Sequence, residues 1–174
     1  MKTIIGISAS LNPNSSNSRI IGFISNFLEG KAELIKYNKL DQLPHFDPSL
    51  KEDEAPIQVQ EFRKLIQKAD GVIISSPEYV FSTPAILKNA IEWTVATTVF
   101  MNGIITGSSS GKIGHEALKL IMKTVTGEID EKCCLLISGV KSKIAAEIKG
   151  SDQKTVGQLK QLADYFIQKL ENKY

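Results

Sequence analysis

The chain has 174 residues, of which 42% are hydrophobic and 23% are charged, and its 21 basic and 19 acidic residues give a net charge of +2. This composition is that of a globular domain long enough to bury a core without metal ions or disulfides. The balanced charge and the presence of only two arginines, Arg19 and Arg63, argue against nucleic acid or an anionic membrane as a partner.

No segment is typical of export or of membrane insertion. The N-terminal run MKTIIGISAS is too short for the apolar region of a signal peptide, and no apolar run approaches the length of a membrane-spanning helix. Cys133 and Cys134 are adjacent, and neighbours on a strand point to opposite faces, so we expect neither a disulfide nor a metal site there. We therefore expect a cytoplasmic protein without a metal.

Predicted strands and helices alternate along the first part of the chain. Apolar, β-branched residues predict one strand at 3–8 and a second at 33–36. Apolar residues at helical spacing predict a helix over 17–29, and Pro56 suits the first turn of another helix that ends at about residue 69.

The alternation continues to the C-terminus. The elements predicted after residue 70 are strands at 71–76, 102–106 and 133–140 and helices at 84–96, 114–126 and 152–172. Five strands that alternate with five helices predict an α/β fold with a doubly wound parallel sheet. No linker or repeat divides the chain, so residues 1–174 are predicted to form a single domain.

Three loops of unusual composition are predicted to meet at one edge of this sheet. Ligands of doubly wound sheets bind outside the carboxyl ends of the strands, where the strand order reverses. The loops after the first, third and fourth predicted strands, at 9–17, 77–83 and 107–114, therefore become the candidate site.

The first loop, SASLNPNSSNSR, is rich in hydroxyl and amide side chains and ends at the start of a predicted helix. Unpaired backbone N–H groups and the helix dipole favour an anion there, so the loop is a candidate cradle for a phosphate monoester. A simple polar turn with a helix cap remains the alternative. The glycine motifs of dinucleotide and triphosphate sites are absent. The candidate phosphate ligands are Ser10, Asn12, Ser15, Ser16, Asn17 and Ser18.

The second loop places bulky apolar residues on a turn. Tyr79, Val80 and Phe81 would form a surface for a planar aromatic ligand, and Pro77 would end the strand and stiffen the turn. Alternatively, these side chains fold back into the core or are buried at a subunit interface. Glu78 at the loop tip is more typical of a solvated carboxylate than of a catalytic group.

The third loop, TGSSSGKIG, offers hydroxyls and close backbone approach. Ser108, Ser109, Ser110 and Gly111 would hydrogen-bond the edge of a heterocycle or a ribityl chain, although a plain solvent loop is the alternative. His115, at the following helix start, is more typical of a solvated polar residue than of a proton donor.

Three segments together resemble the NADPH-dependent FMN reductase family. They are GISASLNPNSSNS, ADGVIISSPEYVFSTPAILKNAIEW and GSSSGKIG. The family's first loop is similar at Ser10, Ser15 and Asn17. Its central motif is matched by Ser76, Pro77, Glu78, Tyr79, Ser82, Pro84, Leu87, Lys88, Asn89, Ala90, Glu92 and Trp93.

The resemblance implies a flavodoxin-like three-layer sandwich with a five-stranded parallel sheet and helices on both faces. It implies FMN as cofactor, with NADPH or NADH as hydride donor and a flavin, quinone, azo compound or metal oxyanion as small-molecule acceptor. FMN phosphate would lie on the first loop, the ring against Pro77–Ser82, and its far edge at Ser108–Gly111. No side chain need act as a catalytic acid or base, because the cofactor carries the chemistry. Relatives commonly pair, which implies a homodimer or homotetramer.

Two departures from the family pattern predict weak retention of FMN. Asn12 stands where arginine is usual, which removes a charge-assisted contact of about 1.5–3 kcal/mol. Arg19 would replace it only if its side chain curls back. Val80 replaces an asparagine, and a β-branched residue disfavours positive φ, so the turn would change or a polar contact would be lost.

Two other functions remain open from the residues. A flavodoxin-like electron carrier would bind FMN without nicotinamide activity, but the T-x-T-G-x-T loop and acidic charge of classical flavodoxins are absent, which favours the reductase. Alternatively, the two substitutions have abolished flavin binding, which would leave a structural or binding protein.

Overall fold

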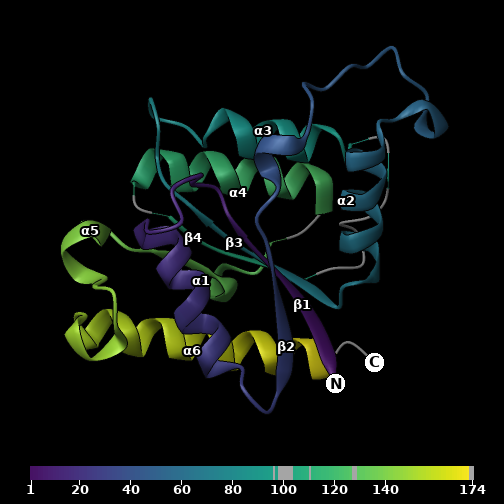
Figure 1. The fold of residues 1–174 in the computed structure, drawn as a ribbon. Coiled ribbons are helices and arrows are strands. Elements are labelled where there is room, and N and C mark those ends of the chain that lie inside the picture. The colour runs from purple at the N-terminus through teal and green to yellow at the C-terminus, as the bar shows by residue number, and fades with distance from the viewer. Residues whose placement is uncertain (96, 98–103, 110, 127–128, 173–174) are drawn as a thin grey trace.

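The computed structural model of the chain describes residues 1–95, 97, 104–109, 111–126 and 129–172 (Figure 1). Its centre is one sheet of parallel strands in the order β2-β1-β3-β4-β5. The strands are β1 (Lys2–Ser8), β2 (Ala32–Tyr37), β3 (Gly71–Ser76), β4 (Ile104–Ser109) and β5 (Cys134–Leu136). The order reverses between β1 and β3, so the first and third strands flank the switch point of the sheet.

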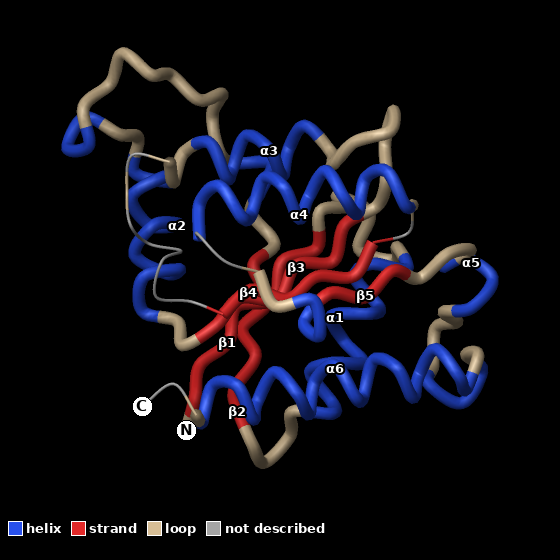
Figure 2. The backbone as a smooth tube through the Cα atoms, turned by 180° about the vertical axis from the view of Figure 1, so that it is seen from behind, coloured by secondary structure: helices blue, strands red, loops and turns tan. Residues whose placement is uncertain are grey.

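Helices cover both faces of the sheet (Figures 1 and 2). One face carries α1 (Ser16–Phe27), α6 (Gln153–Glu171) and the short α5 (Val140–Lys143). The other carries α2 (Ile57–Lys68), α3 (Ala85–Glu92) and α4 (Lys112–Thr126). None of the described helices is both long enough and apolar enough to cross a membrane.

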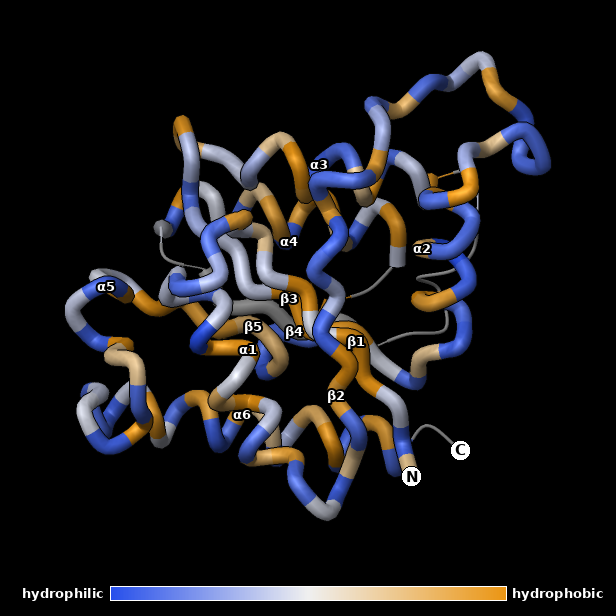
Figure 3. Tube along the Cα trace, viewed as in Figure 1, coloured by the Kyte–Doolittle hydropathy of each residue, from blue (hydrophilic) through white to orange (hydrophobic). Residues whose placement is uncertain are grey.

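Two apolar clusters form the core, one on each face. Alternate residues of β1 enter opposite clusters, with Ile5 and Ile7 packing toward α2 and α3 and Ile4 packing toward α1 and α6. The hydrophobic colouring of β1 and β3 in Figure 3 follows this two-sided burial. The apolar runs in the sequence are therefore strands covered on both faces.

The predicted elements before residue 92 lie within a few residues of the observed ones, but two later strands differ. β4 continues through Ser109, because its backbone pairs with β3 as far as Ser76↔Ser109, and residues 102–103 lie outside the described residues. β5 ends at Leu136 rather than at residue 140, because Gly139 takes a φ of 67° and starts α5. The predicted third loop is thus mostly the end of β4 and the start of α4.

Candidate functional site

Hydroxyl groups are linked into a chain at the N-terminus of α1. Ser15 caps the helix by accepting a hydrogen bond from the Ser18 backbone N–H at 3.1 Å, and the Oγ atoms of Ser15 and Ser18 are 2.9 Å apart. Ser18 Oγ also lies 3.1 Å from Ser8 Oγ and donates to the Asn12 carbonyl at 3.2 Å. These groups lie where the helix dipole favours a negative charge.

Other predicted residues of this loop have roles in its own structure. Asn17 is buried, and its Oδ1 accepts a 2.9 Å hydrogen bond from Ser75 Oγ in β3. Asn12 Oδ1 accepts from the Asn14 backbone N–H at 2.9 Å. Arg19 does not curl back over the loop, because its Nη1 donates to the Ile144 carbonyl at 3.3 Å. Ser10 and Ser16 are half-buried in the same loop and first turn.

The second loop is a tight two-residue turn that follows β3. Tyr79 and Ser82 exchange two backbone hydrogen bonds of 2.9 and 3.0 Å, and Val80 and Phe81 between them have φ values of 49° and 56°. Two successive positive φ angles define a type I′ turn, which normally carries Asn-Gly. The first alternative, that Val80 would avoid positive φ and change the turn, was therefore wrong: the tight backbone pairing imposes positive φ on a β-branched residue, and the strain is retained. The second alternative, the loss of a polar contact to the ring edge, stays a prediction.

The turn presents an exposed apolar surface. The exposed fractions are 54% for Tyr79, 95% for Val80 and 68% for Phe81, so these side chains do not fold back into the core of this chain. Pro77, in contrast, is buried at the end of β3. The surface begins directly at the carboxyl end of β3, beside the loop that follows β1.

Glu78 holds this turn against the start of α4. Its Oε2 accepts a 2.6 Å hydrogen bond from the Gly114 backbone N–H, where the helix dipole favours a carboxylate. A Cβ at Gly111 would collide with the Glu78 carboxylate, and one at Gly114 would lie 2.9 Å from Glu78 Cγ. The description of Glu78 as a solvated carboxylate was therefore wrong, because neighbouring glycines admit it to the helix terminus.

The third predicted segment is placed by the backbone pairing of β4. Ser108 and Ser109 are the last residues of β4 and pair with Ser75 and Ser76, which places them beside the end of β3. Gly111 lies immediately before α4, and Ser110 lies outside the described residues. The parallel pairing therefore brings the ends of β1, β3 and β4 to one edge of the sheet.

Two hydroxyl groups at this edge were not among the candidate ligands. Ser8 Oγ joins the hydroxyl chain at α1. Its position as a polar residue at the end of a strand is the sequence feature that could have indicated a place in the site. Thr83 Oγ1 is buried beyond the turn and has no hydrogen-bond partner among the residues that the structure describes. A buried hydroxyl without a partner is uncommon, and nothing in the sequence distinguishes it from an ordinary loop threonine.

The second half of the central motif anchors the connection between β2 and α2. Asn89 accepts a 2.8 Å hydrogen bond from the Phe46 N–H and donates to the Pro44 carbonyl at 3.0 Å. Trp93 Nε1 donates to the same carbonyl at 2.8 Å, and the Trp93 and Phe46 rings meet edge to face with centroids 5.2 Å apart. These motif residues therefore stabilise the fold around the site.

His115 is buried in the first turn of α4 rather than solvated. Burial lowers the pKa of its imidazole; Glu116 and Glu131 oppose this shift, and Lys119 adds to it. In the part of the chain that is described, no group of three His, Cys, Asp or Glu side chains is arranged to hold a metal ion.

We expect stability to fall as the pH drops below about 6.5, the ordinary pKa of histidine. The unfolded chain protonates its histidine first, because burial lowers the pKa of His115 in the folded state, so acid favours unfolding. Urea unfolding of the wild type and of His115→Gln at pH 7.5 and 5.5 checks this. The variant should lose part of the pH dependence, whereas His45→Gln, at the other and exposed histidine, should keep it.

Comparison with known proteins identifies the family of this chain. Residues 2–129 match the family described as NADPH-dependent FMN reductase. The NADH:(hydroxy)cinnamate reductase subunit CrdA of Vibrio ruber is 33% identical over 114 residues, which cover 64% of this chain and 55% of the relative. The quinone reductase of Escherichia coli K12 is 30% identical over 91 residues, which cover 52% of this chain and 48% of the relative. The chain thus spans about half the length of these curated relatives.

The fold is shared with solved flavoenzymes. FerB of Paracoccus denitrificans, a flavoenzyme NAD(P)H:(acceptor) oxidoreductase, superimposes with a TM-score of 0.76 over 99% of this chain and 98% of its own, at 24% identity. The strand order β2-β1-β3-β4-β5 is that of the flavodoxin-like α/β fold, as the resemblance implied. By the match over residues 2–129, this chain is a member of the NADPH-dependent FMN reductase family.

Proposed function

We propose that this protein binds FMN and is an NAD(P)H-dependent oxidoreductase that passes electrons to a small acceptor such as a flavin, quinone, azo compound or metal oxyanion. The observation that carries the proposal is the position of two surfaces at one edge of the sheet. The hydroxyl chain at α1 follows β1, and the exposed turn at 79–82 follows the adjacent β3. The family membership supports the same reading.

The residues at this edge fit the two ends of FMN. Ser15 and Ser18 offer hydroxyls in front of the unpaired N–H groups of α1, which suits a phosphate. Tyr79 and Phe81 offer an exposed surface for a flat ring, and just beyond the turn the buried Thr83 hydroxyl has no hydrogen-bond partner among the described residues. The chain would thus hold FMN at both ends without a metal ion.

The proposed contacts divide between phosphate, ring and ring edge. For the phosphate they are Ser10, Asn12, Ser15, Ser16, Asn17 and Ser18. For the ring they are Pro77, Glu78, Tyr79, Val80, Phe81 and Ser82, where Glu78 acts by holding the turn against α4. For the far edge of the ring they are Ser108, Ser109, Ser110 and Gly111.

Bound FMN would accept a hydride from the nicotinamide and deliver it to the acceptor. The protein's part is to orient the ring and to exclude water.

Anaerobic mixing tests the proposal. The protein saturated with FMN should lose its flavin absorbance when NADH or NADPH is added, and should recover it when a quinone is added. Protein that binds FMN but is not bleached by either nicotinamide would be an electron carrier instead. Protein that binds no FMN would refute the proposal altogether.

We expect Asn12→Arg to tighten FMN binding about tenfold or more, because a charge-assisted hydrogen bond contributes about 1.5–3 kcal/mol. The exposed Asn12 lies in the loop whose hydroxyls precede α1. Fluorescence titration of FMN measures the change. Asn14→Arg is the matched control, since it adds the same charge two residues away. Equal tightening in both variants would indicate a general effect of charge and no specific phosphate contact.

We further propose a cytoplasmic homodimer, or a homotetramer built from it. Cys134 is a free thiol, which supports a reducing compartment. The outer side of α4 exposes Ile113 and Leu120, two turns apart, and α4 begins beside the exposed 79–82 turn. Two exposed apolar side chains on the helix that begins beside the site support pairing with a second copy there.

Leu120→Glu should convert the assembly to monomers in light scattering, because it places a charge in the proposed contact while leaving the folded monomer intact. Lys123→Glu, one turn along and also exposed, serves as the control for charge alone. A wild type that is monomeric at high concentration would contradict the pairing.

A further inference from the structure

A cavity lies beside the first loop, on the side away from the 79–82 turn. It has a volume of about 420 Å³ and lies between the loop and the carboxyl end of β2. We name it the β2-side cavity; Ser10 and Ser18 line one wall, and Lys36, Asn38 and Asp41 line the other. Its volume is within the range of small-molecule sites.

Two opposite charges line this cavity. Among the residues that the structure describes, neither Lys36 nor Asp41 takes part in an ion pair. The Lys36 ammonium lies beside α1, since a Cβ at Gly22 would be 3.7 Å from its Nζ. Asp41 is exposed in the single helical turn at 40–42 that follows β2. The cavity therefore offers one free cation and one free carboxylate.

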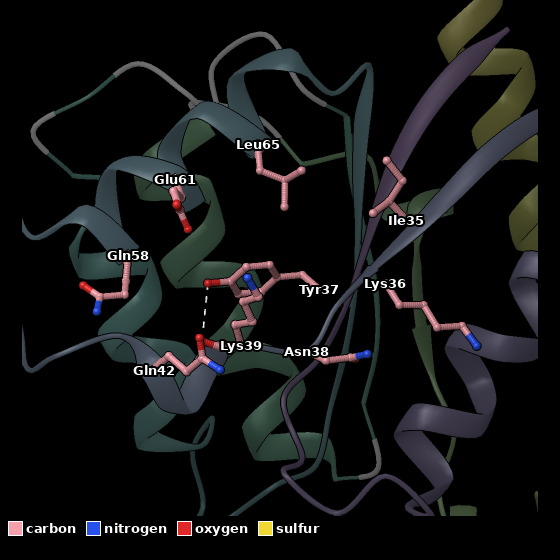
Figure 4. A pocket seen from close by; sticks show the side chains of 9 residues that line it. All are labelled: Ile35, Lys36, Tyr37, Asn38, Lys39, Gln42, Gln58, Glu61 and Leu65. Atoms are coloured by element: carbon pink, nitrogen blue, oxygen red, sulfur yellow. Dashed lines mark hydrogen bonds between the residues drawn. The ribbon is translucent and has the colours of Figure 1, made fainter.

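Lys36, Tyr37 and Asn38 also line a neighbouring cavity of about 410 Å³, which Figure 4 shows. Burial, together with the Glu61 and Asp41 carboxylates, raises the pKa of Tyr37 to about 12, and its hydroxyl donates to the Lys39 carbonyl at 3.3 Å. Glu61 lies on the α2 side of Tyr37 in Figure 4, whereas Lys36 points the other way, toward α1. Only the β2-side cavity shares residues with the hydroxyl-rich loop.

We infer that the β2-side cavity receives the adenosine end of the nicotinamide dinucleotide, and that it favours NADH over NADPH. This inference rests on the proposed oxidoreductase function. Asp41 accepts hydrogen bonds from the 2′- and 3′-hydroxyls of the ribose, and Lys36 faces the pyrophosphate. In doubly wound folds with a glycine-rich dinucleotide motif, an acidic residue about 20 residues further on contacts the ribose 2′-hydroxyl. This chain lacks that motif, but Asp41 is likewise an acidic residue just beyond β2.

The preference for NADH over NADPH follows from charge. A 2′-phosphate carries up to two negative charges into a cavity that the Asp41 carboxyl group lines, and like charges at contact distance repel. Lys36 lies on the α1 side of β2. It therefore offsets the repulsion between Asp41 and the 2′-phosphate less than a cation beside Asp41 would. Free NADH, with a 2′-hydroxyl, instead donates to the carboxylate.

Calorimetric titration of the FMN-saturated protein with ADP-ribose and with 2′-phospho-ADP-ribose tests the inference without hydride transfer. Wild-type protein should bind ADP-ribose more tightly. Asp41→Asn should shift the ratio of the two affinities by about tenfold toward the phosphorylated ligand, which corresponds to about 1.4 kcal/mol. Lys36→Gln should weaken both ligands by a similar factor.

The matched controls are Glu61→Gln and Lys39→Gln. They remove one negative and one positive charge from residues that line the neighbouring cavity, as Asp41→Asn and Lys36→Gln do in the β2-side cavity. Both should leave the two affinities unchanged. An unaltered ratio in Asp41→Asn overturns the inference, and so does a loss of FMN binding in Lys36→Gln, which would assign the cavity to the flavin. If ADP-ribose fails to bind while NADH still bleaches the flavin, the cavity assignment is wrong and the proposed function stands. If ADP-ribose binds as expected but no nicotinamide bleaches the flavin, the proposed function is wrong, and the inference that rests on it falls too.

Discussion

Trp93→Ala is expected to destabilise the protein by about 3–5 kcal/mol, the range for removing a large buried aromatic side chain. Trp93 is fully buried, donates to the Pro44 carbonyl at 2.8 Å, and packs edge to face against Phe46. Its ring also covers the buried guanidinium of Arg63, whose carbon Cζ lies 5.9 Å from the ring centroid. The truncation therefore opens a cavity and uncovers a charge.

Urea unfolding followed by far-UV circular dichroism measures this effect, because Trp93 is the only tryptophan and fluorescence is lost with it. Trp93→Phe is the informative control: it keeps an aromatic ring and loses the N–H donor, so it should cost about 1–3 kcal/mol. A loss below 1 kcal/mol in Trp93→Ala would show that the connection between β2 and α2 does not depend on this contact.

The consequence for the candidate site is indirect. Trp93 and Asn89 hold residues 43–46, and Asp41 of the same connection lines the β2-side cavity. We therefore expect Trp93→Ala to weaken dinucleotide binding more than FMN binding, because the phosphate loop and the 79–82 turn are held by β1, β3 and α4.

The sequence predicted most of the fold because burial on both faces leaves a strong periodic pattern. Ile5 and Ile7 enter one core cluster and Ile4 the other, so a continuous apolar run marked β1 as a central strand. The end of β4 was missed because Ser108 and Ser109 are polar, and their strand conformation depends on backbone pairing with β3. No local pattern carries information about such a partner.

The candidate site was predicted by composition but not in its contacts. Ser15 and Ser18 could be placed at a helix start from local signals alone. Asn17 and Glu78, however, bond to Ser75 and Gly114, which are 58 and 36 residues away along the chain. The burial of His115 likewise depends on how α4 packs. Long-range contacts decide which polar residues of a loop remain free for a ligand.

The 79–82 turn is the place where the chain departs most from local preference. Val80 and Phe81 both have positive φ, and a residue in this strained region costs about 1–3 kcal/mol when it is not glycine or asparagine. Both side chains are exposed, so packing within the monomer does not offset the strain. Strain that persists at an exposed apolar turn is expected where a ligand or partner uses the surface.

The double variant Val80→Asn, Phe81→Gly should therefore stabilise the free protein by about 2–4 kcal/mol, because Asn-Gly is the preferred pair for this turn. It should also weaken FMN binding, since the exposed Phe81 ring is removed from the proposed flavin surface. Urea unfolding without flavin measures the first effect and fluorescence titration the second. The single variant Val80→Asn separates the gain in stability from the loss of FMN binding, because it relieves part of the strain and keeps the Phe81 ring. If the double variant gained no stability, the strain would be absent in solution; if it gained stability and bound FMN as tightly as the wild type, the turn would not be the flavin surface.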